Sequence, residues 1–135
     1  MPFENLLEKI DEYGEFVKYR PITPIQIFQY KLDNCECEIQ ISKTLSKETI
    51  APILIDYLKW LARCENEVRC YFAAKLNESL STDWFQNIEV YNADITFVTS
   101  EDFGAVITFG ESIFPDHIVE LYFEKYEIVN DGLIG

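Results

Sequence analysis

The stretch Ile88-Glu-Val-Tyr-Asn-Ala-Asp-Ile-Thr-Phe97 decides the fold class, because it carries the alternating pattern of a β-strand. Ile88 and Val90 share one parity, whereas the apolar residues from Ala93 to Phe97 share the other. Successive side chains of a strand point to opposite faces, so a change of parity within one strand requires an extra residue. The sequence therefore predicts a strand with a bulge or turn near Asn92.

Two further strands are predicted after this stretch, over residues 105–109 and 118–123. Gly104, Gly110 and Pro115 bound them, and glycine and proline are typical of turns. The tripeptide Asn130-Asp131-Gly132 predicts a tight turn near the end of the chain. The last third of the chain is thus predicted to consist of strands.

Upstream, a β-hairpin is predicted over residues 28–41, with Asp33-Asn34 at its turn. A short strand over residues 16–20 and a turn over residues 20–24, which contains two prolines, precede it. The hairpin register places the apolar residues of both arms on one face. Its predicted cross-strand neighbours are Leu32 with Cys35, Tyr30 with Cys37 and Phe28 with Ile39 on that face, and Lys31 with Glu36 on the other.

Three segments have apolar residues at the spacing of a helix. The first covers residues 2–13 and ends at Gly14. The second has Ser46 as its N-cap, has Pro52 near the start of its regular part and extends to Leu61. The third covers residues 68–76, for which a strand is the alternative. The chain is predicted to form one α+β domain over residues 1–135, a mainly antiparallel sheet with helices packed on one face.

Composition limits the class of protein. The chain has 135 residues, of which 48% are hydrophobic, which is enough for a core and too much for a disordered acidic tail. No apolar run reaches the roughly 20 residues of a membrane-spanning helix. The N-terminus resembles no signal peptide, so we expect a cytoplasmic protein whose four cysteines are thiols.

The distribution of charge is the most informative property of the sequence. The net charge is −13, and residues 76–135 hold twelve acidic residues and a single base, Lys125. From Leu76 to Glu124 there is no lysine or arginine. Such a half-chain repels nucleic acid and anionic membranes and attracts cationic partners. A solvated acidic surface that keeps the protein soluble is the alternative interpretation.

No catalytic, cofactor or metal site is predicted. The spacing of Cys35 and Cys37 differs from that of zinc knuckles, and both are expected in the core. His117 is the only histidine, and its Phe-Pro-Asp-His context predicts a turn that enters a strand. The sequence has no calcium-binding loop and no glycine-rich phosphate loop. A carboxylate pair of the glycosidase type depends on the fold and stays open.

The profile resembles the cytosolic immunity proteins of bacterial contact-dependent growth inhibition and polymorphic toxin systems. The resemblance lies in size, acidity and the tail from Phe109-Gly-Glu-Ser-Ile-Phe-Pro-Asp-His-Ile118 to Gly132-Leu-Ile-Gly135, about a quarter of the chain. It implies a non-catalytic inhibitor, monomeric or weakly dimeric, of a basic protein toxin such as a nuclease domain, whose cleft grips phosphate. The residues expected to contact the toxin are Asp94, Glu101, Asp102, Glu111, Asp116, Glu120 and Glu124.

Two other functions stay open. Secretion chaperones are similar in length and acidity, but usually finish with a helix, for which residues 128–135 lack the spacing. A small enzyme would need a pocket with carboxylates of shifted pKa. Under the inhibitor hypothesis, reversal of Glu101, Asp102 and Glu111 to lysine is expected to weaken capture of the toxin without unfolding the domain.

Overall fold

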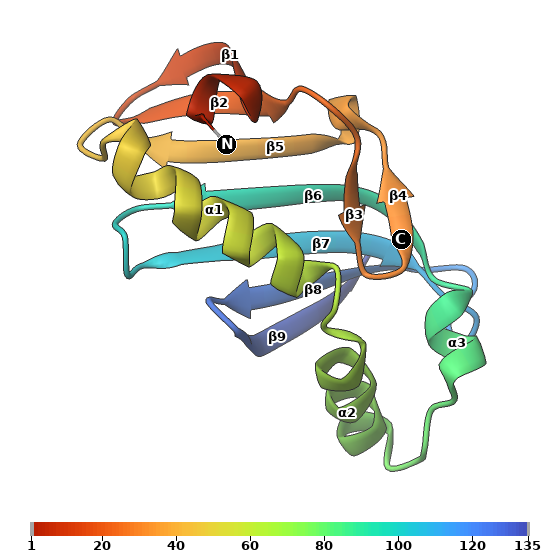
Figure 1. Ribbon diagram of the computed structural model, residues 1–135. Coiled ribbons are helices and arrows are strands. Elements are labelled where there is room, and N and C mark those ends of the chain that lie inside the picture. Colours follow the sequence, from red (N-terminus) through yellow and green to blue (C-terminus); the bar gives the residue numbers. More distant parts are fainter. Residues whose placement is uncertain (1, 135) are drawn as a thin grey trace.

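A seven-stranded sheet carries all the helices on one face (Figure 1). The computed structural model describes residues 2–134. Its strand order is β1-β2-β5-β6-β7-β8-β9, and β3 and β4 form a separate hairpin. The strands are β1 (Leu7–Tyr13), β2 (Phe16–Pro21), β3 (Ile25–Ile27), β4 (Tyr30–Leu32), β5 (Cys37–Ser42), β6 (Glu89–Phe97), β7 (Phe103–Gly110), β8 (Ile118–Glu124) and β9 (Glu127–Ile134), and the helices are α1 (Lys47–Leu61), α2 (Glu65–Leu76) and α3 (Thr82–Gln86).

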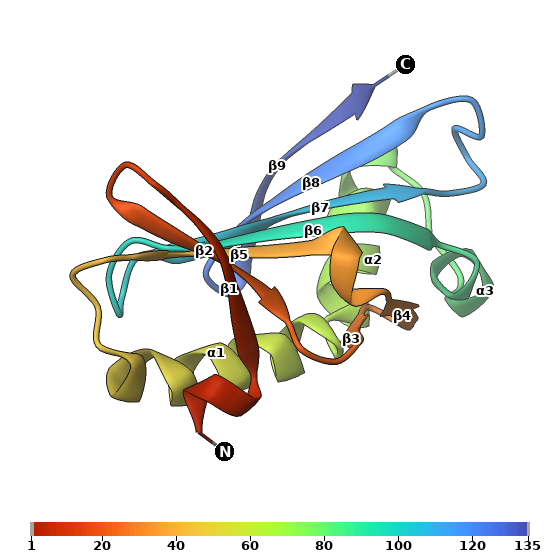
Figure 2. The same ribbon diagram turned by 90° about the horizontal axis from the view of Figure 1, so that it is seen from above.

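The predicted α+β class is confirmed. Strands β5 and β6 are parallel neighbours, whereas every other neighbouring pair is antiparallel. Parallel strands need a crossover, and here the crossover contains all three α-helices. Figure 2 shows the resulting layers, with the helices and the β3–β4 hairpin on one side of the sheet and no helix on the other.

The predicted bulge is present in β6. Its register against β7 shifts between Val90 and Asn92, and the buried set changes parity there, with Val90 and Ala93 both inside. The strands predicted over residues 16–20, 105–109 and 118–123 also form, as β2, β7 and β8. The alternating pattern was a reliable guide here because each of these strands buries only one of its faces.

The predicted first helix is wrong. Phe3–Asn5 forms one 3-10 turn, and Leu7–Tyr13 is strand β1, which pairs with β2. Gly14 has a φ of 57° and makes a tight turn between the two strands, so it ends a strand and not a helix. Ile10, a member of the predicted helical stripe, is 44% exposed. Hydrogen bonding to β2 therefore determines the structure of this segment, and the few apolar residues at helical spacing do not.

The predicted hairpin over residues 28–41 is wrong as well. β4 pairs with β3, and β5 pairs with β2 and β6. Phe28 forms the β3–β4 turn with a φ of 57°, and its ring is buried against Phe85 and Phe109. Because residues 34–36 form a 3-10 turn before β5, Cys35 is exposed and only Cys37 is buried, whereas both were expected in the core.

The C-terminal turn was also misplaced. Residues 130–132 lie inside β9, and the turn that precedes β9 contains Lys125, with a φ of 52°. The pairing of β9 with β8 extends from Glu127 to Ile134. A tripeptide with strong turn propensity is thus held extended by its neighbouring strand.

Helices α1 and α2 confirm their predictions. The Ser46 hydroxyl accepts a hydrogen bond from the Thr49 amide at 3.1 Å and caps α1. Pro52 lies inside α1, five residues after its start, so the helix begins earlier than expected. Residues 65–76 form helix α2, in which Val68 and Phe72 are buried on one side, so the strand alternative is wrong.

Tyr57 of α1 occupies the centre of an aromatic cluster. Its ring centroid lies 4.9 Å from that of Phe103 and 5.6 Å from that of Tyr126, both in edge-to-face geometry. The side chain is fully buried, and among residues 2–134 its hydroxyl has no hydrogen-bond partner. A buried hydroxyl without a partner opposes folding, because it loses its bonds to water.

Replacement of Tyr57 by phenylalanine is therefore expected to leave the free energy of unfolding unchanged or to raise it by about 1 kcal/mol. Tyr71→Phe is the matched control, because the Tyr71 hydroxyl donates a 2.6 Å hydrogen bond to Asp131 and its loss destabilises the fold. Urea unfolding followed by circular dichroism measures both. A clear loss of stability in Tyr57→Phe would show that the hydroxyl has a partner in solution.

Candidate partner-binding face

The side of the sheet opposite the helices is called the open face below. Alternation along each strand sends one set of side chains into the helix layer and the other set to this face. Among the described residues no helix covers it (Figure 2). The side chains on its five central strands include Lys18, Arg20, Glu38, Gln40, Asn92, Asp94, Thr96, Val106, Thr108, Ile118, Glu120, Tyr122 and Glu124.

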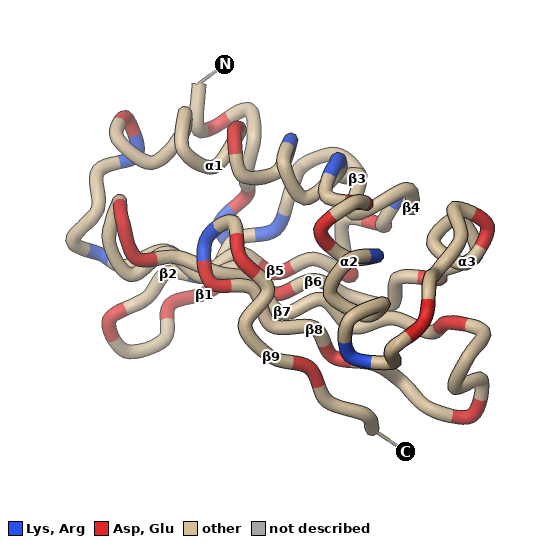
Figure 3. The backbone as a smooth tube through the Cα atoms, turned by 90° about the horizontal axis from the view of Figure 1, so that it is seen from below, with Lys and Arg blue, Asp and Glu red and all other residues tan. Residues whose placement is uncertain are grey.

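Carboxylates gather in the middle of the open face. Glu38 of β5 and Asp94 of β6 are directly paired across the parallel ladder, and Glu120 lies two strands further on. The nearest cation is Lys18, whose Nζ is 3.5 Å from Glu38 Oε1. Figure 3 shows the wider distribution, in which lysine and arginine are interspersed with acidic residues along β1, β2 and the helices, whereas acidic residues prevail along β6–β9. The open face is therefore negative over its C-terminal strands.

The pKa of Asp94 is raised above the ordinary value of an aspartate. Desolvation is the largest cause that raises it, and the charges of Glu38 and Glu120 raise it further. Lys18 acts in the opposite direction but does not reverse the shift. The ionised Asp94 carboxylate is consequently under-compensated within the protein, and a cation from outside would stabilise it.

A hollow of about 360 Å³ lies beside this cluster, over Gly104. Gly104 faces the open side opposite Thr96 and Glu124, and a Cβ atom there would come within 2.3 Å of the Phe123 carbonyl oxygen. The absence of a side chain therefore keeps the strands close and the surface concave. Asp94, Asp102 and Glu124 line the hollow.

Apolar side chains mark the other end of the open face. Tyr91 and Ile118 are each 38% exposed, and Ile134 is 44% exposed. Ile118 pairs with Ile134 across β8 and β9, and the Tyr91 ring lies over Gly110, where a Cβ atom would come within 2.5 Å of its hydroxyl. Exposed apolar side chains beside polar ones make this surface a candidate for binding a protein partner.

The predicted contact residues thus fall into two groups. Asp94, Glu120 and Glu124 lie on the open face and Asp102 at its edge, with Glu101 in the adjoining β6–β7 turn. Asp116 and Glu111 lie in the loop between β7 and β8, at the opposite end of these strands. Glu38 was not predicted from the sequence. The alternation of Glu38 and Gln40 with apolar residues indicated an exposed face, but the incorrect hairpin paired this strand with residues 28–32, whereas it pairs with β2 and β6.

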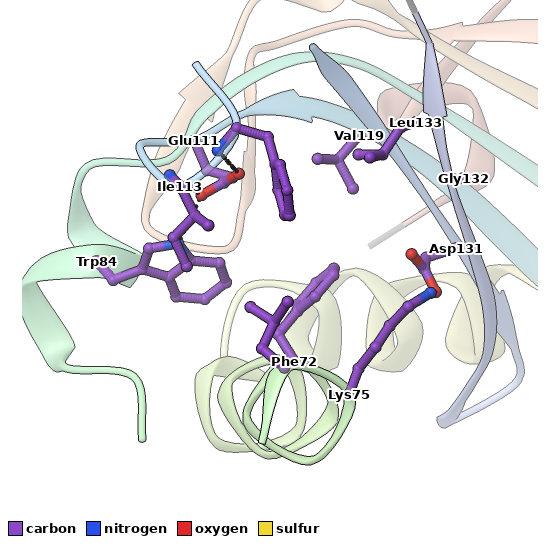
Figure 4. A pocket seen from close by; sticks show the side chains of 11 residues that line it. Phe72, Lys75, Trp84, Glu111, Ile113, Val119, Asp131, Gly132 and Leu133 are labelled. Atoms are coloured by element: carbon purple, nitrogen blue, oxygen red, sulfur yellow. Dashed lines mark hydrogen bonds and ion pairs between the residues drawn. The ribbon is translucent and has the colours of Figure 1, made fainter. Parts of the chain in front are cut away.

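Glu111 points into the protein and belongs to its structure (Figure 4). Its carboxylate accepts hydrogen bonds from Trp84 Nε1 at 2.8 Å, the Ile113 amide at 2.6 Å and the Phe114 amide at 2.8 Å. These bonds fix the β7–β8 loop against α3 around a cavity of about 300 Å³ that is lined mainly by apolar side chains. The expectation that Glu111 can be reversed without harm to the fold is therefore corrected.

The four cysteines lie in two kinds of surroundings, because Cys35 and Cys70 are exposed. Cys37 and Cys64 are buried, and burial raises the pKa of each thiol to about 12, so they stay protonated at neutral pH. His117 lies in the exposed turn before β8, as predicted, and its amide donates to the Phe114 carbonyl at 3.0 Å. Within residues 2–134 no three His, Cys, Asp or Glu side chains are arranged to hold a metal ion. No helix in this range is long and apolar enough to cross a membrane.

Glu111→Lys is expected to lower the free energy of unfolding by about 2 kcal/mol or more, because three donors lose their acceptor and face a cation. Glu101→Lys, with the same change of charge in an exposed turn, is expected to stay within about 0.5 kcal/mol of the parent. Urea unfolding followed by tryptophan fluorescence measures both. Equal stability of the two variants would contradict the structural role of Glu111.

Asp94→Asn is expected to raise stability at pH 7. Since the folded pKa of Asp94 is raised, the folded state binds its proton more tightly than the unfolded state, so ionisation removes stability as the pH rises above the ordinary aspartate value of about 4. The gain in Asp94→Asn should therefore shrink as the pH falls towards that value. Urea titrations between pH 4 and 7.5, with Asp116→Asn as control, measure it. A gain that does not depend on pH would rule out this explanation.

No protein-family model matches this chain, and no curated protein or solved structure matches it at a significant level.

Proposed function

We propose that this protein is a non-catalytic inhibitor that binds a basic protein through the open face. The observation that supports this proposal is the group formed by Asp94, Glu120, Glu124 and Glu38, which come from three strands and share one uncovered, concave surface. Maintaining like charges side by side opposes folding. A cationic partner would remove that repulsion when it binds.

A protein fits this surface better than a single ion or a small molecule. Three large apolar side chains border the acidic region, and the hollow over Gly104 is wide and shallow. Protein interfaces combine apolar and polar contacts over a wide area, and the open face offers both kinds of side chain next to each other. The negative field also disfavours nucleic acid and anionic membranes as partners.

The partner class we propose is a bacterial toxin, with a nuclease domain as the leading case. A nuclease must present lysine and arginine to bind phosphate, so an acidic surface that occupies its cleft competes directly with the substrate. Opposite charges also speed association, with rate constants that fall as salt rises. A protein of this kind would act as an immunity protein, as a monomer or weak dimer.

The experiment is affinity capture from a lysate of the cells that make the protein, at low and high salt, followed by mass spectrometry and an affinity measurement with the purified partner. The triple variant Asp94→Lys, Glu120→Lys and Glu124→Lys is expected to weaken binding by at least about 100-fold, because each pair loses attraction and gains repulsion. The matched control reverses Glu48, Glu67 and Glu78, which are exposed on the helix side.

Both triple variants change the net charge by the same amount, so the comparison separates the open face from overall charge. Equal weakening by the two variants would show that binding depends on the overall negative charge and not on the open face. Capture of no basic protein, or normal capture by the folded open-face variant, would overturn the proposal.

A further inference from the structure

The two edges of the sheet differ in how well they are protected against pairing. In β1, four of the seven residues are charged. The register shifts once in each edge pair, between Lys9 and Asp11 in β1 and at Val129 in β9, so the two edges differ in charge and not in their bulges. Charges and bulges are the devices that keep an edge strand from adding another strand. β9 has eight residues, only Glu127 and Asp131 are charged, and Leu133 and Ile134 are 49% and 44% exposed.

The charge on Asp131 does not protect the outer edge. Its side chain is 7% exposed and is held by the Tyr71 hydroxyl and by an ion pair with Lys75, both on α2. In Figure 2, β9 forms the rim of the sheet, and the residues from Asp131 to Leu133 line a cavity together with α2. Within residues 2–134 no strand pairs with that rim.

The register identifies the amides that point outward from β9. Successive residues of an antiparallel strand turn their N–H and C=O groups alternately to the two neighbouring strands. The Lys125 amide donates to the Phe103 carbonyl of β7, and the Phe123 carbonyl lies against Gly104 of β7, so both residues direct their backbone groups to β7. The residues of β8 that alternate with Phe123, which are Ile118, Glu120, Tyr122 and Glu124, therefore bond to β9. Their partners in β9 are Glu127, Asn130, Gly132 and Ile134. Val129 is the extra residue at the register shift, and the regularly paired residues that remain are Ile128, Asp131 and Leu133, whose amides point away from the sheet.

The side chains of an added strand would meet two different surfaces. Those directly opposite Ile128 and Leu133 would project to the helix side, next to apolar neighbours. The side chain opposite Asp131 would also project to the helix side. Those opposite Asn130 and Gly132 would project to the open face, where no atom lies within 4 Å of a Cβ position at Gly132. Gly132 pairs with Glu120, so a long cationic side chain can lie across the glycine towards that carboxylate.

We propose that an extended segment of the cationic partner adds to the outer edge of β9 as an eighth strand, with apolar side chains towards the helices and lysine or arginine towards Glu120 and Glu124. This proposal rests on the proposed function and specifies how the partner is held. Strand addition supplies main-chain hydrogen bonds, and the alternation of side chains supplies specificity. A second copy of this chain is the poorer occupant, because it brings a second charge of −13 and another set of acids to the same edge.

The probe is an end-capped octapeptide of alternating lysine and valine, used at a concentration at which it is monomeric. Its matched control has N-methyl groups on the valine amides, which keeps the side chains and charge but removes the donors that would bond to β9. The parent peptide is expected to bind at least about tenfold more tightly, which corresponds to about one lost hydrogen bond or more. In hydrogen exchange by NMR it should protect the amides of Ile128, Asp131 and Leu133.

Leu133→Pro removes one outward donor without altering charge, at a position where an edge strand tolerates proline, and Leu133→Ala is its control. The proline variant should lose about tenfold in affinity for the peptide relative to the alanine variant. Equal binding of the methylated and unmethylated peptides, or unprotected β9 amides in the complex, would overturn strand addition.

The two proposals fail in different ways. Binding that is abolished by the open-face triple variant but unaffected by N-methylation would leave the proposed function standing and remove strand addition. Binding that is weakened by N-methylation of the peptide but is unchanged in the triple variant would contradict the cationic specificity and with it the proposed function. Protection of the same β9 amides by rising protein concentration alone would show that a second copy occupies the edge.

Discussion

The parallel pairing of β5 with β6 is the constraint on which the rest of the structure depends. Two parallel neighbouring strands cannot be joined by a tight turn. The chain between β5 and β6 must therefore run back from the end of β5 to the opposite end of the sheet, where β6 begins. Residues 43–88 make this return and contain all three α-helices. All helical cover is therefore on one face, and β6–β9 follow as an antiparallel meander whose other face is bare.

This arrangement sorts the charges of the sequence. The strands of the meander alternate, so their apolar residues, such as Ile107 and Leu121, fill the core below the helices. Their polar positions are left on the bare face, and in this half of the chain those positions carry carboxylates without nearby bases. Glu38 joins them only because β5 lies next to β6. The candidate surface is thus a product of topology as much as of composition.

Sequence reasoning succeeded where the local pattern and the final environment agree. The parity change at Asn92, the Ser46 cap and the buried stripe of α1 all depend on neighbours close in sequence. It failed where distant strands decide: β1 was taken for a helix, and β5 was assigned to its neighbour in sequence. No rule based on nearby residues indicates that Phe28 is inserted into the core with a positive φ.

The same distinction applies to the candidate site. Acidity along the last third of the chain selected seven carboxylates as candidate contacts, and the strand register places three of them, Asp94, Glu120 and Glu124, on the open face. It could not distinguish Glu111, whose carboxylate is bound by Trp84 and by loop amides. Those bonds depend on α3, a five-residue helix that was not predicted.

The crossover also has a consequence for the order in which the chain folds. Strands β6 to β9 are joined by short turns and can find one another quickly, whereas the β5–β6 pair must first close a loop of more than forty residues. The meander is therefore the natural folding nucleus, yet it carries most of the uncompensated negative charge of the molecule. Self-repulsion among these strands opposes the earliest step of folding, and we expect dissolved salt, which screens it, to speed the folding of this chain.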